Sequence, residues 1–322
     1  MGTFNRMQLL LAGMALAWAG CASDRSDEVF SIIVLPDTQI YSKDDSIWRN
    51  SSKREVFYAM TDWVAKTAAS ENIKFVLHVG DVVNDNDQPY QWDNAAGAMK
   101  VLDGVVPTAI ALGNHDMEFE TRNTANFDRT FPGVERNACY FFDSGSLQFM
   151  VLKLELGPTD ETLAWANDVL AQHADKQVIV LTHSYMLAED RRDYPGGFGY
   201  LPPGSNTGEE IWEKLIRHHA HVFLVVCGHV TNNGMHRGML ASEGVHGNTV
   251  YQLLCGEGHD GWLYQLRFDP KAGHISVETY SPWSPHSPAA QLYQYGTALP
   301  GYNLDSLHQY HLPYHFKNTY QQ

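Results

Sequence analysis

Several features are scarce or missing in this chain, and each absence excludes a class of protein. Basic residues are few: 22 Lys and Arg stand against 37 Asp and Glu, which gives a formal charge of −15 over 322 residues. Such an acidic surface repels phosphate backbones over most of its area, so general nucleic-acid binding is not expected. The chain also lacks heptad runs, repeats of solenoid period and low-complexity blocks, which excludes coiled coils and repeat architectures.

Cysteine is scarce as well, with four residues in the whole chain. Their spacing is unlike that of a zinc–cysteine site. Cys227 and Cys255 each end an apolar run, and we expect both to be buried free thiols. A disulfide between these two residues is the alternative.

The longest apolar run, residues 9–18, is too short to span a bilayer and follows the basic residue Arg6. It ends in Ala19-Gly20-Cys21, which resembles a bacterial lipobox in which Cys21 becomes the lipidated first residue. We therefore expect a signal peptide at 1–20, a tether at 21–28 and membrane anchoring through Cys21 at the bacterial cell envelope, on its periplasmic or surface face. The alternative is an ordinary secretory signal cleaved nearby.

Beyond residue 28, short apolar runs alternate with amphipathic helical patterns. The runs are 30–35, 73–79, 108–112, 147–154, 177–181, 222–226, 249–254, 262–268 and 275–279. Several are apolar throughout, which is typical of strands covered on both faces. Helix starts are indicated by capping boxes at Ser52–Glu55 and Thr207–Glu210 and by Thr159. This order predicts an α/β protein.

No linker-like stretch interrupts residues 29–282, so we expect one domain there. The composition changes in residues 283–322, where Pro, Tyr and His are frequent and no periodicity is visible. We expect this segment to be a tail that is draped over the domain or partly disordered.

Five of the apolar runs lead directly into a residue able to bind a metal or a phosphate. These residues are Asp37, Asp81, Asn114, His183 and His229. In open α/β sheets, sites form at the carboxyl ends of the strands, so these distant residues are expected to converge. Carboxylate, amide and imidazole groups suit Mn, Fe, Zn or Mg better than a thiophilic metal.

The same segments resemble the motif set of the calcineurin-like metallophosphoesterases. The matching motifs are Asp37-Thr38-Gln39, Gly80-Asp81-Val82-Val83, Gly113-Asn114-His115-Asp116, Thr182-His183 and Gly228-His229-Val230-Thr231. The resemblance covers residues 30–280 and implies a four-layer α/β/β/α sandwich with two mixed sheets. It also implies an enzyme that cleaves phosphate monoesters or diesters of a small phosphorylated substrate by attack of a metal-bound hydroxide.

The family's roles can be carried over by position. Two divalent metal ions are implied, with Asp81 bridging them. The second ion would be completed by Asn114, His183 and His229, and the first would be bound by Asp37 and Gln39. His115 would protonate the leaving group or steady the phosphoryl oxygens, oriented by Asp116.

Two positions depart from the motif set, and both belong to the first metal. Gln39 and Thr231 stand where the family usually has His. Three interpretations stay open. In the first, Asp37, Asp81 and the Gln39 amide oxygen hold the ion, with water completing its shell. In the second, another residue substitutes, the candidates being His236, Glu257 and His259. In the third, the first site is empty, which leaves a mononuclear or inactive protein.

A second function class is a non-catalytic surface lipoprotein that uses a degenerate phosphoesterase fold as a binding module. Gln39 and Thr231 support it, whereas His115 has no evident purpose in a binding module. A secreted nuclease is a third class, and the acidic charge argues against it.

Three other features have both a functional and a structural interpretation. The segment 189–200 after His183 could be a surface loop, or a substrate wall or lid in which Arg191 or Arg192 holds a phosphate. The run 84–87 could touch substrate or form a turn. His78 is expected to be a hydrogen-bonded core residue.

Overall fold

The computed structural model describes residues 28–44, 47–48, 51–197, 200–230, 237–256, 260–283, 306 and 308–317. The predicted signal peptide and Cys21 lie outside these residues, as do Thr231, His236, Glu257 and His259. Within the described ranges, no helix combines the length and the apolar character needed to cross a membrane.

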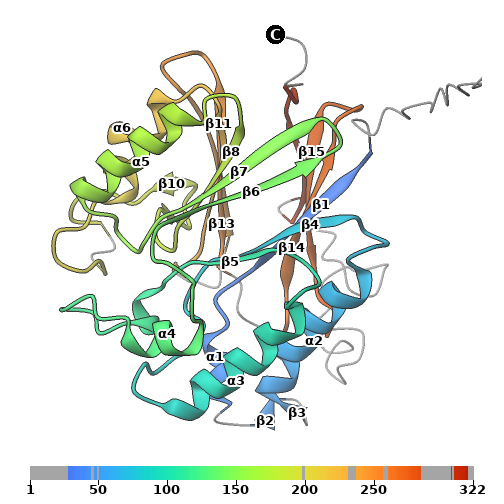
Figure 1. The fold of residues 1–322 in the computed structure, drawn as a ribbon, viewed down its shortest axis with the longest axis vertical. Helices are drawn as coiled ribbons and strands as arrows, with labels where there is room; N and C mark the ends of the chain where they lie inside the picture. Colours follow the sequence, from blue (N-terminus) through green and yellow to red (C-terminus); the bar gives the residue numbers. More distant parts are fainter. Residues whose placement is uncertain are drawn as a thin grey trace, which may run out of the picture.

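Two six-stranded mixed sheets form the centre of the molecule (Figure 1). The first, in the order β16-β15-β14-β1-β4-β5, contains β1 (Phe30–Leu35), β4 (Ile73–His78), β5 (Thr108–Ile110), β14 (Leu263–Asp269), β15 (His274–Tyr280) and β16 (Gln309–Pro313). The second, in the order β12-β13-β11-β8-β7-β6, contains β6 (Ala138–Ser144), β7 (Leu147–Lys153), β8 (Gln177–Leu181), β11 (Val222–Cys227), β12 (Arg237–Glu243) and β13 (Thr249–Cys255). Two short hairpins, β2 (Ile47–Trp48) with β3 (Ser51–Ser52) and β9 (Met186–Leu187) with β10 (Arg191–Arg192), stand apart from both sheets.

Helices cover the outer face of each sheet. The first sheet is covered by α2 (Lys53–Thr67) and α3 (Pro89–Met99), and the second by α5 (Asp160–Gln172) and α6 (Gly208–Lys214). Figure 1 shows these helices on opposite sides of the paired sheets. The remaining α-helices, α1 (Gln39–Lys43) and α4 (Ala125–Thr130), are short. The predicted four-layer α/β/β/α sandwich is confirmed.

The core between the two sheets is aromatic. The ring of Phe149 lies 5.4 Å from that of Phe30 and 6.0 Å from that of Phe268, so both sheets contribute to it. Full burial of one such side chain contributes about 1.5–3 kcal/mol of stability. Every residue of β1, β8 and β11 is buried, which explains why these strands are apolar apart from Ser31 and Gln177.

The longer strands that the sequence did not predict, β6, β12 and β16, are mostly half-buried or exposed. β6 and β12 are antiparallel strands at the edges of the second sheet, and only Phe142 and Ser144 in β6 and Gly238 in β12 are buried. β16 pairs with β15, and its Leu312 is buried in the core. The domain boundary expected at residue 282 therefore omits a strand, because the apolar residues of β16 alternate with polar ones.

Two of the three predicted helix caps form. Thr159 accepts a hydrogen bond from the Thr162 amide, and Thr207 and Glu210 form a reciprocal capping box. The capping box predicted at Ser52 is wrong, because the Ser52 hydroxyl instead donates to the Asp44 carboxylate at 2.5 Å. Cys139, Cys227 and Cys255 are free thiols, and the last two are buried, as expected.

Candidate metal centre

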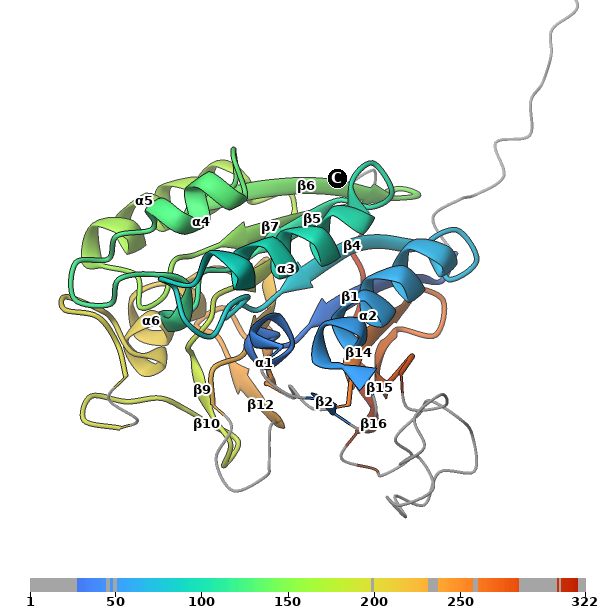
Figure 2. The same cartoon turned by 90° about the horizontal axis from the view of Figure 1, so that it is seen from below.

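The loops that follow the parallel strands β1, β4, β8 and β11 lie at one end of the sandwich. Asp37 follows β1, and Figure 2 shows the short helix α1 at the end of that strand. Asp81 follows β4, His183 follows β8 and His229 follows β11. Asn114 begins a single 3-10 turn after β5.

His183 lies at the middle of this cluster and is fully buried. Its Nδ1 lies 2.8 Å from the Val79 carbonyl oxygen, which can only accept, so Nδ1 carries a proton and donates it. Its Nε2 faces three other predicted ligands: the Asn114 Oδ1 at 3.2 Å, the Asp81 Oδ2 at 3.3 Å and the His229 Nδ1 at 3.2 Å. A backbone carbonyl that fixes the tautomer in this way is typical of a metal-binding histidine.

Asp37 completes the group of strand-end residues. Its carboxylate lies 3.8 Å from the His183 Nδ1 and accepts a hydrogen bond from the His229 backbone N–H at 3.1 Å. The structure thus brings Asp37, Asp81, Asn114, His183 and His229 together around one imidazole.

The donor atoms fit a divalent cation. One ligand atom each from Asp81, His183 and His229 lies within 4.8 Å of the other two. The Gln39 Oε1 is buried and has no hydrogen-bond partner among the described residues. A buried carbonyl oxygen without a partner costs about 1–3 kcal/mol, a cost that coordination to a cation would remove. These donors are of the type that Mn, Fe, Zn and Mg accept.

Close backbone approach around the carboxylates requires glycine at two positions. A Cβ on Gly113 would lie 2.0 Å from the Asp81 Oδ1, and a Cβ on Gly228 would lie 2.4 Å from the Asp37 Oδ1. Asp81 and His229 themselves have positive φ angles, 51° and 77°, which non-glycine residues rarely adopt. Backbone strain of this kind is typical of functional sites.

His78 ties together the two loops that carry the carboxylates. The Gly80 N–H donates to the His78 Nδ1 at 3.1 Å, so Nε2 carries the proton and donates to the Thr38 hydroxyl at 3.0 Å. Burial, assisted by the nearby His183, lowers the pKa of His78 to about 3, which keeps the ring neutral. The prediction of a hydrogen-bonded core histidine is confirmed.

The charges of the cluster balance one another when no ion is bound. Burial alone would lower the pKa of His183, but Asp81 outweighs it and raises this pKa to about 9. Burial would raise the pKa of Asp81, and His183 lowers it to about 2. Burial raises the pKa of Asp37 to about 8, with His183 opposing and Asp81 adding to the shift. The proton on His183 therefore supplies positive charge at the place where a cation would bind.

His115 is oriented differently from the sequence prediction. Its Nδ1 donates to the Asn84 carbonyl oxygen at 2.6 Å, and its backbone N–H donates to the Asp81 Oδ1 at 3.0 Å. The expectation that Asp116 orients His115 is wrong. The Asp116 carboxylate turns back and accepts hydrogen bonds from the backbone amides of Val82 and Val83 in the loop after β4 and of Gly113 in its own turn. Asp116 therefore positions the loops rather than the imidazole.

Sequence reasoning missed Gln91, which holds the loop behind His115. The fully buried Gln91 accepts hydrogen bonds from the backbone amides of Asn84 and Asp85 at 2.8 and 2.9 Å. Its Nε2 donates to the Asp85 carboxylate at 2.9 Å. The run 84–87 thus forms a bend fixed from behind by α3. No local pattern marked Gln91, because only the folded chain places it against this bend.

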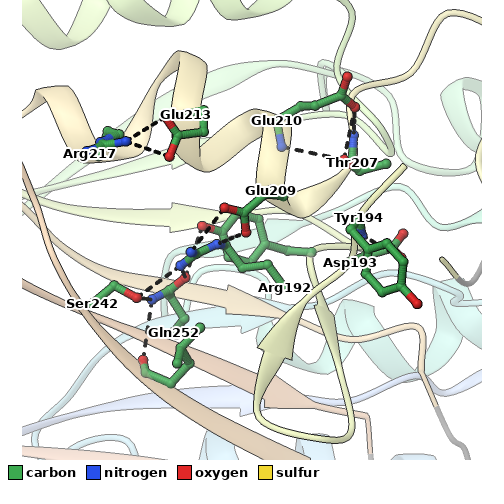
Figure 3. Close-up of polar contacts among 12 residues, drawn as sticks. Arg192, Asp193, Tyr194, Thr207, Glu209, Glu210, Glu213, Arg217, Ser242 and Gln252 are labelled. Atoms are coloured by element: carbon green, nitrogen blue, oxygen red, sulfur yellow. Dashed lines mark hydrogen bonds and ion pairs between the residues drawn. The ribbon is translucent and has the colours of Figure 1, made fainter. Parts of the chain in front are cut away.

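Arg192, one of two candidate phosphate-binding residues, is held within the protein (Figure 3). Its guanidinium donates to Glu209 at 2.6 Å and to Ser242 and Gln252 at 3.0 Å each. It also lies 4.5 Å from the ring centroid of Trp212. The hypothesis that Arg192 binds phosphate is therefore wrong, because the β9–β10 hairpin packs this side chain against α6.

Arg191, the other candidate, is exposed and lies beside neighbours of its own loop. Its Nε is 3.7 Å from the Glu189 carboxylate, and its guanidinium stacks over the Tyr194 ring at 5.1 Å. This arrangement agrees with the surface-loop interpretation of the segment.

The model of the calcineurin-like phosphoesterase family matches residues 30–233. The uncharacterised protein YvnB of Bacillus subtilis (strain 168) is 28% identical over 80% of the chain, which spans only 20% of that protein's length. A probable cyclic nucleotide phosphodiesterase of Moraxella catarrhalis is 29% identical over 52% of the chain, and the match spans 61% of its length. The purple acid phosphatase PPD1 of yellow lupin shares the fold, with a TM-score of 0.54 and 15% identity over 80% of this chain and 52% of its own.

Proposed function

Because the chain belongs to the calcineurin-like phosphoesterase family, we propose that it is a metal-dependent hydrolase of phosphate monoesters or diesters. The observation that carries this proposal is the buried cluster around His183, in which carboxylate, amide and imidazole groups from four separate loops meet. A binding surface has no need for so many desolvated polar groups at one point. The name of the Moraxella catarrhalis relative gives additional support to a phosphodiesterase.

Asp81, Asn114, His183 and His229 would hold one divalent ion. Asp37 and Gln39 would hold a second, with Asp81 shared between the two. When bound, such ions lower the pKa of a coordinated water and stabilise charge on phosphoryl oxygens. The protein itself fixes the ligands: the Val79 carbonyl sets the tautomer of His183, and the His229 backbone N–H holds the Asp37 carboxylate.

His115 would move the proton that the leaving group needs. Its Nδ1–H is committed to the Asn84 carbonyl, so the proton to be donated sits on Nε2 of the imidazolium form. The contact between its backbone N–H and Asp81 keeps the residue next to the metal ligands. Gln91 holds the bend that presents the Asn84 carbonyl, and so positions His115 indirectly.

Replacing His115 by Ala should lower kcat by roughly 10²–10⁴-fold, because general acid catalysis typically contributes that much. Metal content, measured by elemental analysis, should not change, since the His115 side chain is not among the proposed ligands. His246→Ala is a matched control, because His246 lies on an exposed turn and is not among the proposed ligands. Turnover of His115→Ala at the wild-type rate would contradict the assigned role.

Gln39→Ala should reduce the metal content from two ions to one, because the variant loses the buried Oε1 proposed as a ligand. Gln39→His should keep two ions. Lys43→Ala, on the same helix α1, serves as a control with unchanged content. Two ions in Gln39→Ala would mean that another residue, such as His236, Glu257 or His259, supplies the ligand. One ion in the wild-type protein would mean that the first site is empty.

We further propose that the substrate is a small phosphorylated molecule outside the cell membrane, with the protein anchored through lipidated Cys21. The alternative, a non-catalytic binding module, is favoured by the departures at Gln39 and Thr231. The decisive experiment is hydrolysis of a panel of monoesters and diesters by protein loaded with Mn, Zn, Fe or Mg. A metal-loaded protein that hydrolyses no member of the panel would support the binding module instead.

A further inference from the structure

Two aromatic side chains from distant loops stand beside the metal ligands. The Tyr200 ring lies 6.2 Å from the His229 ring and 5.2 Å from the Phe119 ring. The His229 ring in turn lies 4.9 Å from that of His183. The rings thus form a row that runs from the buried cluster outward. We call Phe119 and Tyr200 the aromatic wall.

Tyr200, the ring of this row next to His229, is open to solvent. Tyr200 is 52% exposed, the largest fraction among the exposed large hydrophobic side chains of the described residues. Exposed aromatic surface gains free energy when another apolar surface covers it. A planar group is the best cover for a flat ring, because offset stacking adds to the gain from burial.

Arg122 holds the two loops of the wall together. It follows Phe119 by three residues, and it donates to the Pro203 carbonyl at 3.3 Å and to the Ser205 hydroxyl at 2.6 Å, both shortly after Tyr200. The same guanidinium contacts Glu155 at 3.3 Å. The wall is therefore preorganised, which reduces the ordering cost that binding would otherwise carry.

We propose that the aromatic wall makes the protein selective for phosphate esters whose alcohol carries a planar aromatic group, either an aryl ring or a nucleobase. The phosphate would lie at the metal ligands and the planar group would stack on Tyr200. This inference rests on the proposed phosphoesterase function and assigns its substrate class. Recognition would be by the face of the ring, which every aryl group and nucleobase offers.

The test compares phenyl phosphate with cyclohexyl phosphate, whose rings have similar size but different shape. Each variant is compared with wild type on the same ester, so the intrinsic reactivity of the ester cancels. Tyr200→Ala and Phe119→Ala should lose roughly three- to tenfold in kcat/KM on the phenyl ester, the range expected for one aromatic pair. The cyclohexyl ester should change by less than about twofold, and Tyr200→Phe should behave as wild type because it keeps the stacking face.

Tyr194→Ala is the matched control, because Tyr194 is 41% exposed in the same segment and its ring faces Arg191 rather than His229. Equal losses on both esters, or no loss on either, would overturn the inference while leaving the proposed function intact. If metal-loaded wild-type protein hydrolyses neither these esters nor any other ester of the panel, the proposed function fails and the inference fails with it. Elemental analysis of each variant verifies that the metal content is unchanged.

Discussion

Asp81→Asn is expected to abolish measurable phosphoesterase turnover, with a fall in kcat of more than about 10³-fold. Removing one preorganised electrostatic group from an active site costs roughly 10²–10³-fold. Asp81 should exceed that range, because its carboxylate is the ligand proposed to be shared by two ions and lies 3.3 Å from the His183 Nε2. Elemental analysis should show a lower metal content in this variant.

The fold should survive this substitution. Asparagine has nearly the shape of aspartate, and its Oδ1 can still accept the hydrogen bond from the His115 backbone N–H. Circular dichroism of the metal-free variant should therefore show native secondary structure, whereas its thermal midpoint should be lower than that of wild type, because buried His183 loses its carboxylate partner. Asp87→Asn, which neutralises an exposed carboxylate in the neighbouring bend, should keep both metal and activity. An Asp81→Asn protein with full metal content and wild-type rates would refute the metal centre.

The extent to which the sequence predicts this fold depends on where each strand lies. Strands such as β1, β8 and β11 are buried on both faces, so they are almost entirely apolar and visible in the sequence. In the edge strands β6 and β12 and the late strand β16 most positions are half-buried or exposed, so burial does not require an apolar residue at each of them. Their place is decided by the sheet they join rather than by their own composition.

The candidate ligands were predictable because strand ends impose a shared position on residues far apart in sequence. Their supporting residues were not. Asp116 follows His115 directly, yet its carboxylate accepts from the Val82 backbone amide in the loop after β4 and from the Gly113 amide of its own turn. Gln91 holds the Asn84 amide of a loop that only the folded chain places against it. The loop of Tyr200 is held next to that of Phe119 by the contacts of Arg122 with Pro203 and Ser205. A local pattern carries no information on contacts of that kind.

Metal affinity is expected to rise steeply with pH in the neutral range. Without an ion, the pKa of His183 is raised to about 9 by Asp81 against the effect of burial, and burial raises the pKa of Asp37 to about 8. Both groups therefore carry a proton at neutral pH, and both must lose it to coordinate a cation. Below these pKa values, each expelled proton makes the apparent affinity rise about tenfold per pH unit, so the combined slope approaches roughly a hundredfold. Above about pH 9 neither proton is present, and the dependence should vanish.

Isothermal titration with Mn²⁺ in buffers of different ionisation enthalpy counts these protons directly. We expect between one and two protons to be released per binding event at neutral pH, and none in strongly alkaline solution. Asp37→Asn should release one proton fewer, because the amide does not titrate while His183 keeps its contact with Asp81. An affinity that stays flat from mildly acidic to alkaline pH, with no protons released, would mean that the cation does not displace the protons of His183 and Asp37. The ligand set proposed for this end of the sandwich would then be wrong, even if the protein binds metal elsewhere.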